Sequence, residues 1–236
     1  MTDAGGVASG VPPLGRPRVH LRATTSTSDR ARALAVAGAP HGTIVTAGAQ
    51  TAGRGRQGRI WAAPPGRALL CSLLLRAYDP LLPLRAGLAV ADLAGEAALV
   101  KWPNDVLVDG RKLAGILVEA RPQSGWAVLG IGVNVAVDVD DLPPEVREGA
   151  ATLARPPAAL EPTLDELLAR LAVRLSEPAP VCLAALRARD ALRDRPVRWA
   201  AGEGIGGGID GMGALLVRLP DGAVRTLDAG EVHLDS

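Results

Sequence analysis

The chain of 236 residues carries 26 basic and 25 acidic side chains, so its formal net charge at pH 7 is +1. This balance argues against a general nucleic-acid-binding protein, which normally has a basic surplus. A hydrophobic content of 48% and a charged content of 22% are typical of a soluble globular protein. The length allows one full-sized domain and a second, small one.

The two cysteines, Cys71 and Cys182, fit neither a disulfide framework nor a zinc site. Cys71 lies in an apolar run and is read as a small core residue. No secretory signal is visible in the first residues, and no run reaches the length of a membrane span. We therefore expect a cytoplasmic protein.

The first half of the chain reads as a lead-in followed by mixed strands and helices. Gly, Pro and Ala dominate residues 1–17, which we expect to be disordered. A Ser/Thr cluster at 24–28 is suited to cap a following helix. The expected elements are a strand at 19–23, a helix at 29–37, a strand at 43–49, a buried strand at 68–76 and a central helix at 80–98.

The middle of the chain has strong turn signals between short apolar runs. Asp109-Gly110 predicts a tight hairpin, and a Pro-rich connection covers 142–157. The expected strands lie at 99–102, 106–108, 113–120 and 126–137.

Two predicted helices follow, and after them the sequence pattern changes to short apolar runs between Gly-rich turns. Leucines at helical spacing predict a helix at 163–176, with Thr163 and Glu166 at capping-box spacing. A second helix is expected at 181–192. Beyond residue 192, short apolar runs alternate with Gly-rich turns, which is the pattern of a small β-barrel. Its strands are expected at 197–200, 215–219, 223–227 and 231–234.

The segment 53–61, GRGRQGRIW, is the most informative in the chain. Glycines let backbone N–H groups approach an anion, and arginines offer planar charged forks for carboxylate or phosphate. Trp61 supplies an apolar face on which a base can stack. The pattern predicts a cationic lid over a small anionic ligand. An anion- or RNA-binding module is the non-enzymatic alternative, and the near-neutral net charge disfavours it.

Two further segments contain polar residues in apolar surroundings. Lys112 follows the predicted hairpin turn and could reach into a pocket, although on its own it reads better as a surface lysine. Glycines within 129–135 indicate close approach of a ligand or of another backbone. Asn134 in that strand needs partners if it is buried, either in a ligand site or in a turn. The stretch 202–207 formally matches G-x-G-x-x-G, but it lacks the strand–helix setting of a dinucleotide site.

Taken together and in order, the segments 53–61, 101–105, 112–119 and 130–134 resemble those of the biotin–protein ligases. The likeness extends from about residue 25 to the C-terminus. Each motif is only suggestive alone, whereas four at this spacing are highly specific.

The resemblance implies an α/β (α+β) fold in two domains. A mixed-sheet catalytic domain of the biotin/lipoate ligase type would occupy 18–192, with helices packed on the sheet. A small SH3-like β-barrel would occupy 193–236. Since only about 18 residues precede the first expected strand, we expect no N-terminal DNA-binding domain and no DNA as a partner.

The reaction implied by the resemblance joins biotin to ATP as biotinyl-5′-AMP and then passes biotin to a lysine. The implied partners are biotin, ATP with Mg²⁺, and the biotin carboxyl carrier domain of acyl-CoA carboxylases, with no protein metal ligands and no membrane. The protein would be a monomer or a weak homodimer. A lipoate–protein ligase, which shares the fold and the adenylation strategy, is the alternative.

The resemblance also assigns site residues. The family usually has Asn where this chain has Ser28. The implied catalytic residues are Lys112, Arg56 and Asp105. The implied biotin-binding residues are Ser26, Thr27, Ser28, Gln50, Gly53, Arg54, Gly55, Arg56, Lys112, Gly115 and Gly132. The implied ATP- or adenylate-binding residues are Arg56, Arg59, Trp61, Asn104, Lys112 and Asn134.

Overall fold

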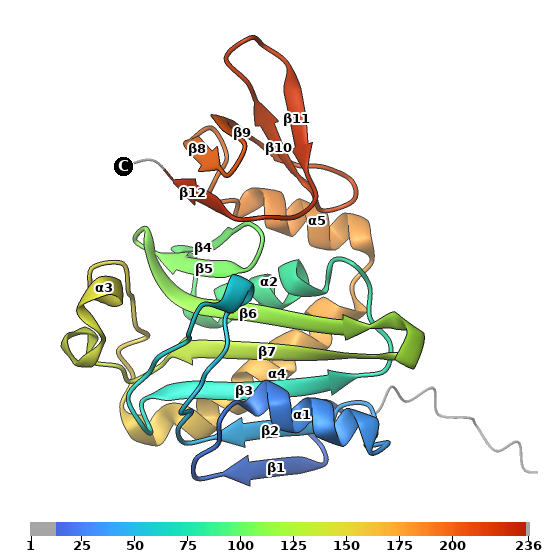
Figure 1. Cartoon of the computed structure of the whole chain (residues 1–236), viewed down its shortest axis with the longest axis vertical. Helices are drawn as coiled ribbons and strands as arrows, with labels where there is room; N and C mark the ends of the chain where they lie inside the picture. The colour runs from blue at the N-terminus through green and yellow to red at the C-terminus, as the bar shows by residue number, and fades with distance from the viewer. Residues whose placement is uncertain (1–12, 235–236) are drawn as a thin grey trace, which may run out of the picture.

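A seven-stranded sheet forms the centre of the molecule in the computed structural model, which describes residues 13–234 (Figure 1). The strand order is β1-β2-β3-β7-β6-β5-β4; β1 and β2 are parallel and all other neighbours are antiparallel. This is the mixed sheet predicted. Its strands are β1 (Arg18–Leu21), β2 (Ile44–Ala47), β3 (Ala68–Leu75), β4 (Ala98–Lys101), β5 (Asp105–Val108), β6 (Arg111–Arg121) and β7 (Trp126–Asn134).

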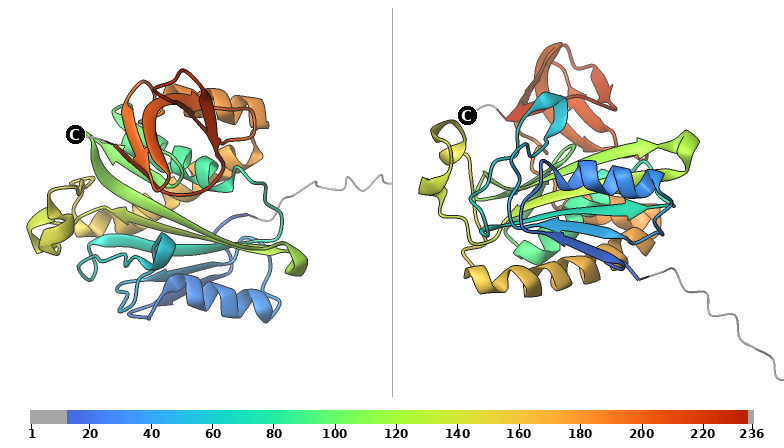
Figure 2. Two further views of the ribbon diagram at one scale, coloured as in Figure 1. Left: turned by 45° about the horizontal axis from the view of Figure 1, so that its top comes forward. Right: turned by 60° about the horizontal axis from the view of Figure 1, so that its bottom comes forward.

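Helices cover both faces of this sheet, because its central strands are apolar on both sides. Figure 2 shows α1 on one face and α2 with α4 on the other. Every residue of β3 is buried, and alternate residues face opposite layers. Leu73 and Leu75 belong to the main core with α2 and α4, whereas Leu74 packs with Ala31 of α1. The helices are α1 (Thr27–Val36), α2 (Leu82–Ala94), α3 (Pro144–Arg147), α4 (Leu160–Ser176) and α5 (Ala179–Ala188).

A five-stranded antiparallel sheet follows α5, and it corresponds to the SH3-like barrel expected at the C-terminus. Its order is β11-β10-β9-β8-β12, and its apolar residues share the main core with those of the larger sheet. Trp102 joins the two sheets, since its Nε1 donates to the carbonyl of Gly213 at 3.0 Å. The division near residue 192 stays a prediction. The strands are β8 (Pro196–Trp199), β9 (Gly202–Ile209), β10 (Leu215–Arg218), β11 (Val224–Leu227) and β12 (Val232–Leu234).

The G-x-G-x-x-G match at 202–207 lies within strand β9, which the sequence did not predict. Added Cβ atoms on Gly204 and Gly206 would come within 2.5 Å and 2.0 Å of backbone oxygens. These glycines therefore allow close backbone packing inside the barrel.

All four predicted helices have different bounds in the structure. The helix expected at 29–37 is α1 (Thr27–Val36), and the helix expected at 181–192 is α5 (Ala179–Ala188). The helix expected at 80–98 is α2, which ends at Ala94 because Gly95 has φ +104° and closes the helix. The capping box at Thr163 is wrong: α4 starts at Leu160, so Thr163 lies inside its first turn. Pro162 is tolerated there because the first-turn N–H groups have no helical partner. The Thr163 hydroxyl instead accepts from Arg155.

Most of the predicted lead-in, residues 1–12, lies outside the described part of the chain. Within its described remainder, the N–H of Gly15 donates to the carbonyl of Gly42 at 2.8 Å, and Leu14 packs against the core. No helix in residues 13–234 is long and apolar enough to cross a membrane.

A buried arginine of α2, Arg85, connects α2 to the C-terminal end of α4. The Arg85 side chain is 4% exposed and pairs with Asp79. It also donates to the carbonyls of Arg174 and Glu177, which lie at the end of α4 and just beyond it. Those carbonyls have no helical partner of their own, so Arg85 acts as the C-terminal cap of α4.

We predict that Arg85→Ala lowers the free energy of unfolding by about 2 to 3 kcal/mol, because it leaves two carbonyls and a carboxylate without their hydrogen-bond donor. Chemical denaturation of the purified protein measures this loss. The matched control is Arg170→Ala, which removes an exposed arginine from α4, the helix that Arg85 of α2 caps. Equal stability of the two variants would contradict the capping role.

Candidate active site

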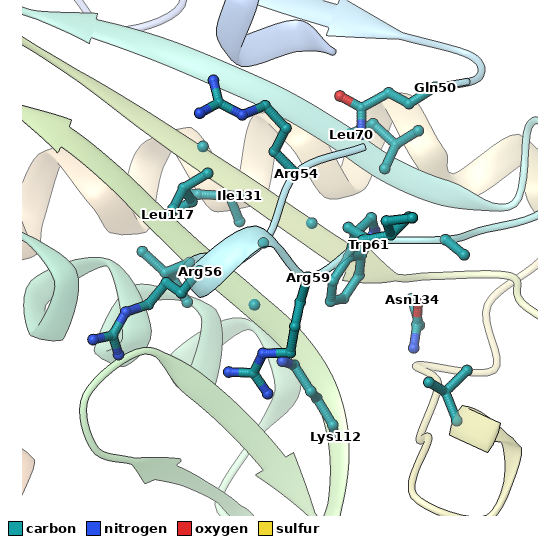
Figure 3. A pocket seen from close by; sticks show the side chains of 18 of the residues that line it. Gln50, Arg54, Arg56, Arg59, Trp61, Leu70, Lys112, Leu117, Ile131 and Asn134 are labelled. Atoms are coloured by element: carbon teal, nitrogen blue, oxygen red, sulfur yellow. The ribbon is translucent and has the colours of Figure 1, made fainter. Parts of the chain in front are cut away.

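The larger sheet carries a cavity of about 780 Å³ beside the start of α1 (Figure 3). All the site residues named from the sequence line this cavity except Gly53 and Asp105. Segments far apart in the sequence therefore meet at one place. The lining residues named in advance are Ser26, Thr27, Ser28, Gln50, Arg54, Gly55, Arg56, Arg59, Trp61, Asn104, Lys112, Gly115, Gly132 and Asn134.

Residues 53–61, the Gly/Arg loop, cover the cavity as a closed turn. The N–H of Trp61 donates to the carbonyl of Gly53 at 3.0 Å, and the N–H of Gly55 donates to the carbonyl of Arg59 at 2.7 Å. Residues 56–58 form the short 3₁₀ helix η1 at its tip. Gly53 lies at the base, where a Cβ would come within 2.3 Å of the Trp61 carbonyl oxygen.

The Trp61 side chain lies among the residues that line the cavity (Figure 3), and its indole packs against two glycines of the sheet. Gly115 of β6 and Gly132 of β7 are direct cross-strand partners. A Cβ on Gly132 would come within 2.5 Å of the indole, and one on Gly115 within 3.0 Å. Only glycine at these two positions lets the indole approach the sheet this closely.

Two loop arginines are paired with carboxylates from other elements. Arg54 contacts Asp29 of α1 at 3.0 Å and Glu119 of β6 at 3.1 Å. Arg59 contacts Glu231, just before β12, at 2.5 Å. Both cations are neutralised by partners that an anionic ligand would have to replace.

Arg56 connects the loop to both sheets. Its guanidinium donates to Asn104 Oδ1 and to the carbonyl of Gly230, each at 3.0 Å. Burial lowers the pKa of Arg56, although a guanidinium remains charged. His233 of β12 also lines the cavity. The C-terminal sheet therefore supplies part of the site, which the sequence did not predict.

Lys112 reaches the cavity from the start of β6. Its Nζ lies 2.8 Å from Asp105 Oδ1 and 5.7 Å from the centre of a Trp61 ring. Asp105 itself lies behind Lys112, outside the cavity lining. Its β4 partner Lys101 has a pKa lowered mainly by burial, with Asp105 acting in the opposite direction. Asp105 thus pairs with Lys112 and acts electrostatically on Lys101, and both lysines are part-exposed.

The two asparagines are anchored by backbone carbonyls. Asn104 Nδ2 donates to the carbonyl of Ile116 at 3.1 Å, and Asn134 Nδ2 donates to the carbonyl of Ala151 at 2.9 Å. The amide of Asn134 is therefore oriented through its Nδ2, and the amide of Asn104 through both ends, since its Oδ1 also accepts from Arg56.

The opposite end of the cavity is lined by hydroxyls and an amide. Ser26 is the N-cap of α1 and accepts from the N–H of Ser28. Gln50 Oε1 accepts from the N–H of Thr27 at 2.7 Å, so its Nε2 is turned away from α1. A Cβ on Gly53 would come within 2.9 Å of that Nε2. Thr27 and Gln50 are uncharged polar groups, and the one arginine nearby, Arg54, is paired with Asp29 and Glu119, in contrast to the cationic end around Lys112 (Figure 3).

Several lining residues were missed by the sequence reasoning. The Pro-rich connection bonds to β6 through the N–H of Lys112, which donates to the carbonyl of Gly149 at 2.6 Å. It thereby forms one wall of the cavity, with Leu142, Pro143 and Val146. Cys71 also lines the cavity, and burial raises the pKa of its thiol to about 12, so it is uncharged. Apart from the Pro-rich composition, no local signal marks these residues.

The chain is similar to known ligases in both sequence and structure. The model of the Biotin/lipoate A/B protein ligase family matches residues 21–136. A biotin–[acetyl-CoA-carboxylase] ligase of Paracoccus denitrificans is 36% identical, over 90% of this chain and 98% of the relative. The structure of a biotin protein ligase from Aquifex aeolicus in complex with biotin and ATP superposes with a TM-score of 0.79 at 26% identity, covering 93% of this chain and 99% of that one.

Other relatives are longer proteins. A bifunctional ligase/repressor BirA of Bacillus spizizenii is 38% identical over 60% of this chain, and the match spans 47% of that relative. The chain therefore spans about half the length of that relative. Since the Paracoccus relative is matched over nearly its whole length, the chain belongs to the biotin/lipoate A/B protein ligase family.

Proposed function

We propose that this protein is an ATP-dependent biotin–protein ligase. The observation that carries the proposal is one cavity with a cationic end at Lys112, Arg56 and Arg59, and an uncharged polar end at Thr27 and Gln50. The cationic end suits a carboxylate next to a phosphate, and the polar end suits the cyclic urea of biotin. The names of the Paracoccus and Aquifex relatives support the same substrates.

In the first step, a carboxylate oxygen of biotin attacks the α-phosphorus of ATP and pyrophosphate leaves. Negative charge gathers on the α-phosphoryl oxygens, where fixed cations stabilise the transition state. Lys112 supplies such a cation once it exchanges Asp105 for the phosphate. In the same way, Arg59 leaves Glu231 and binds a phosphate of ATP.

In the second step, a lysine amine of the carrier protein attacks the carbonyl carbon of biotinyl-5′-AMP and AMP leaves. The mixed anhydride hydrolyses if water reaches it, so the site has to exclude water until the lysine arrives. Trp61 on the bare Gly115–Gly132 backbone and the closed turn of the Gly/Arg loop form that cover. Before ATP binds and after AMP leaves, Asp105 holds Lys112 in place through the 2.8 Å contact between its Oδ1 and Lys112 Nζ.

Mg²⁺ is expected to accompany ATP. Among residues 13–234, no group of three or more His, Cys, Asp or Glu side chains is placed to hold a metal ion. The phosphates and water would therefore be its main ligands.

The natural partner is proposed to be a biotin carboxyl carrier domain of an acyl-CoA carboxylase, as the name of the Paracoccus relative indicates. The expected cytoplasmic location, the monomer or weak homodimer, and the absence of DNA and membrane partners stay predictions.

The first prediction separates biotin from lipoate, since the family contains ligases for both. We expect ATP-dependent pyrophosphate release with biotin and none above background with lipoate, because the dithiolane ring of lipoate offers no hydrogen bonds to the polar end. A continuous pyrophosphate assay measures both. Release with lipoate alone would overturn the proposed function.

The second prediction concerns Lys112. Lys112→Ala removes the cation nearest Asp105 in the cavity, and we expect the rate of pyrophosphate release to fall by about 100-fold or more. Circular dichroism should be unchanged, because Lys112 is part-exposed. The control is Arg111→Ala, an exposed cation one residue earlier on β6. Normal turnover by Lys112→Ala would make Lys112 a bystander.

The third prediction concerns the cover. Arg56→Ala breaks the bonds from the Gly/Arg loop to Asn104 and Gly230, so biotinyl-5′-AMP should escape faster. Escaped adenylate labels lysines of an added bystander protein such as albumin, and we expect several-fold more labelling than in the wild type. Arg67→Ala, an exposed arginine just outside the loop, is the control. Bystander labelling at the wild-type level would exclude this role.

A further inference from the structure

Ser72 of β3 is a fully buried hydroxyl outside the cavity lining, and it bonds to two residues that line the cavity. Its Oγ lies 2.8 Å from Thr27 Oγ1 and 3.1 Å from Ser28 Oγ. The Thr27 hydroxyl in turn lies 3.1 Å from Gln50 Oε1. Four side chains thus form one chain of hydrogen bonds from Ser28 to Gln50.

The direction of every bond in this chain is fixed by counting protons. The amide of Gln50 is oriented by the N–H of Thr27, which needs an acceptor and finds Oε1 at 2.7 Å. Oε1 can only accept, so Thr27 donates its single hydroxyl proton to it. Ser72 must then donate to Thr27, and Ser28 must donate to Ser72.

The consequence lies at Ser28, because its only hydroxyl proton is committed to Ser72. Ser28 Oγ therefore presents lone pairs, and no proton, to the cavity that it lines. Gly130, the β7 partner of Ser72, makes room for this oxygen, since a Cβ there would come within 2.9 Å of Ser28 Oγ. At the other end of the chain, Gln50 Nε2 has no bond within the described residues and remains a donor.

We propose that Ser72 is a positioning residue that fixes Ser28 as a hydrogen-bond acceptor for a ring N–H of the substrate. This inference rests on the proposed function. A cyclic urea carries a carbonyl flanked by N–H groups, which matches a donor at Gln50 and an acceptor at Ser28. Ser72 thereby sets selectivity without touching the ligand.

The test uses two analogues of biotin in which one ring N–H or the other is replaced by oxygen, giving cyclic carbamates. In the wild type, one analogue should have a KM for pyrophosphate release about tenfold above that of biotin, because two acceptors then face each other. The kcat should change little. In Ser72→Ala the Ser28 proton is released and can turn toward the ring oxygen, so the KM ratio should fall to about twofold or less.

The matched control is Thr43→Val, which removes another buried hydroxyl, bonded to the carbonyl of Pro40 and outside this chain. It should keep the wild-type KM ratio. Ser28→Ala should bring the ratio of the analogue's KM to that of biotin close to one. The double variant with Ser72→Ala should show the same ratio, because Ser72 acts only through Ser28. Should Ser72→Ala not fold, Ser72→Cys, whose thiol donates weakly, should give an intermediate ratio.

A wild-type KM ratio retained in Ser72→Ala, or a ratio near one in the wild type for both analogues, would overturn the inference while leaving a biotin-dependent ligase intact. Failure of the proposed function is a different result, namely no pyrophosphate release with biotin itself.

Discussion

The contact of Trp61 with bare sheet backbone is the constraint on which the candidate site depends. Gly115 and Gly132 face each other across β6 and β7, and their missing side chains leave a flat patch. The indole covers that patch, and the Trp61 N–H closes the Gly/Arg loop onto Gly53. A methyl group at Gly132 would lift the indole and with it the whole loop. The positions of the three arginines in the Gly/Arg loop therefore depend on the two glycines of β6 and β7.

The charges of the site are balanced internally in a way that prepares it for an anion. Three cations of the site are paired with carboxylates. Arg54 contacts both Asp29 and Glu119. Arg59 contacts Glu231, and Lys112 contacts Asp105. Such pairs keep cations in place without a ligand, and their partly exposed geometry makes the net cost of exchange small. An anionic substrate can thus replace one acceptor by another. The Arg59–Glu231 contact also gives the C-terminal sheet a physical connection to the loop.

Much of the fold could be predicted from local patterns. The central strand β3 is recognisable because it is apolar on both faces, and Asp109-Gly110 marks the turn between β5 and β6. The α4 start could not be read correctly, because Thr163 and Glu166 have capping-box spacing but bond to Arg155 instead. Strand β9 was missed because its glycines carry no apolar pattern, only a need for close packing.

The sequence by itself determined the chemistry of the site: a glycine–arginine loop, a lysine after a hairpin, one asparagine in a turn and another at the end of a strand, in an order that indicates one family. These are local features, since residue type and spacing along the chain are enough to recognise them. Only the tertiary structure decided which groups face one another. Ser72 bonds Thr27 and Ser28 from a strand more than forty residues away, and Glu231 meets Arg59 from the other sheet. Hydrogen-bond direction and ion pairing depend on distances through space, and no spacing along the chain records them.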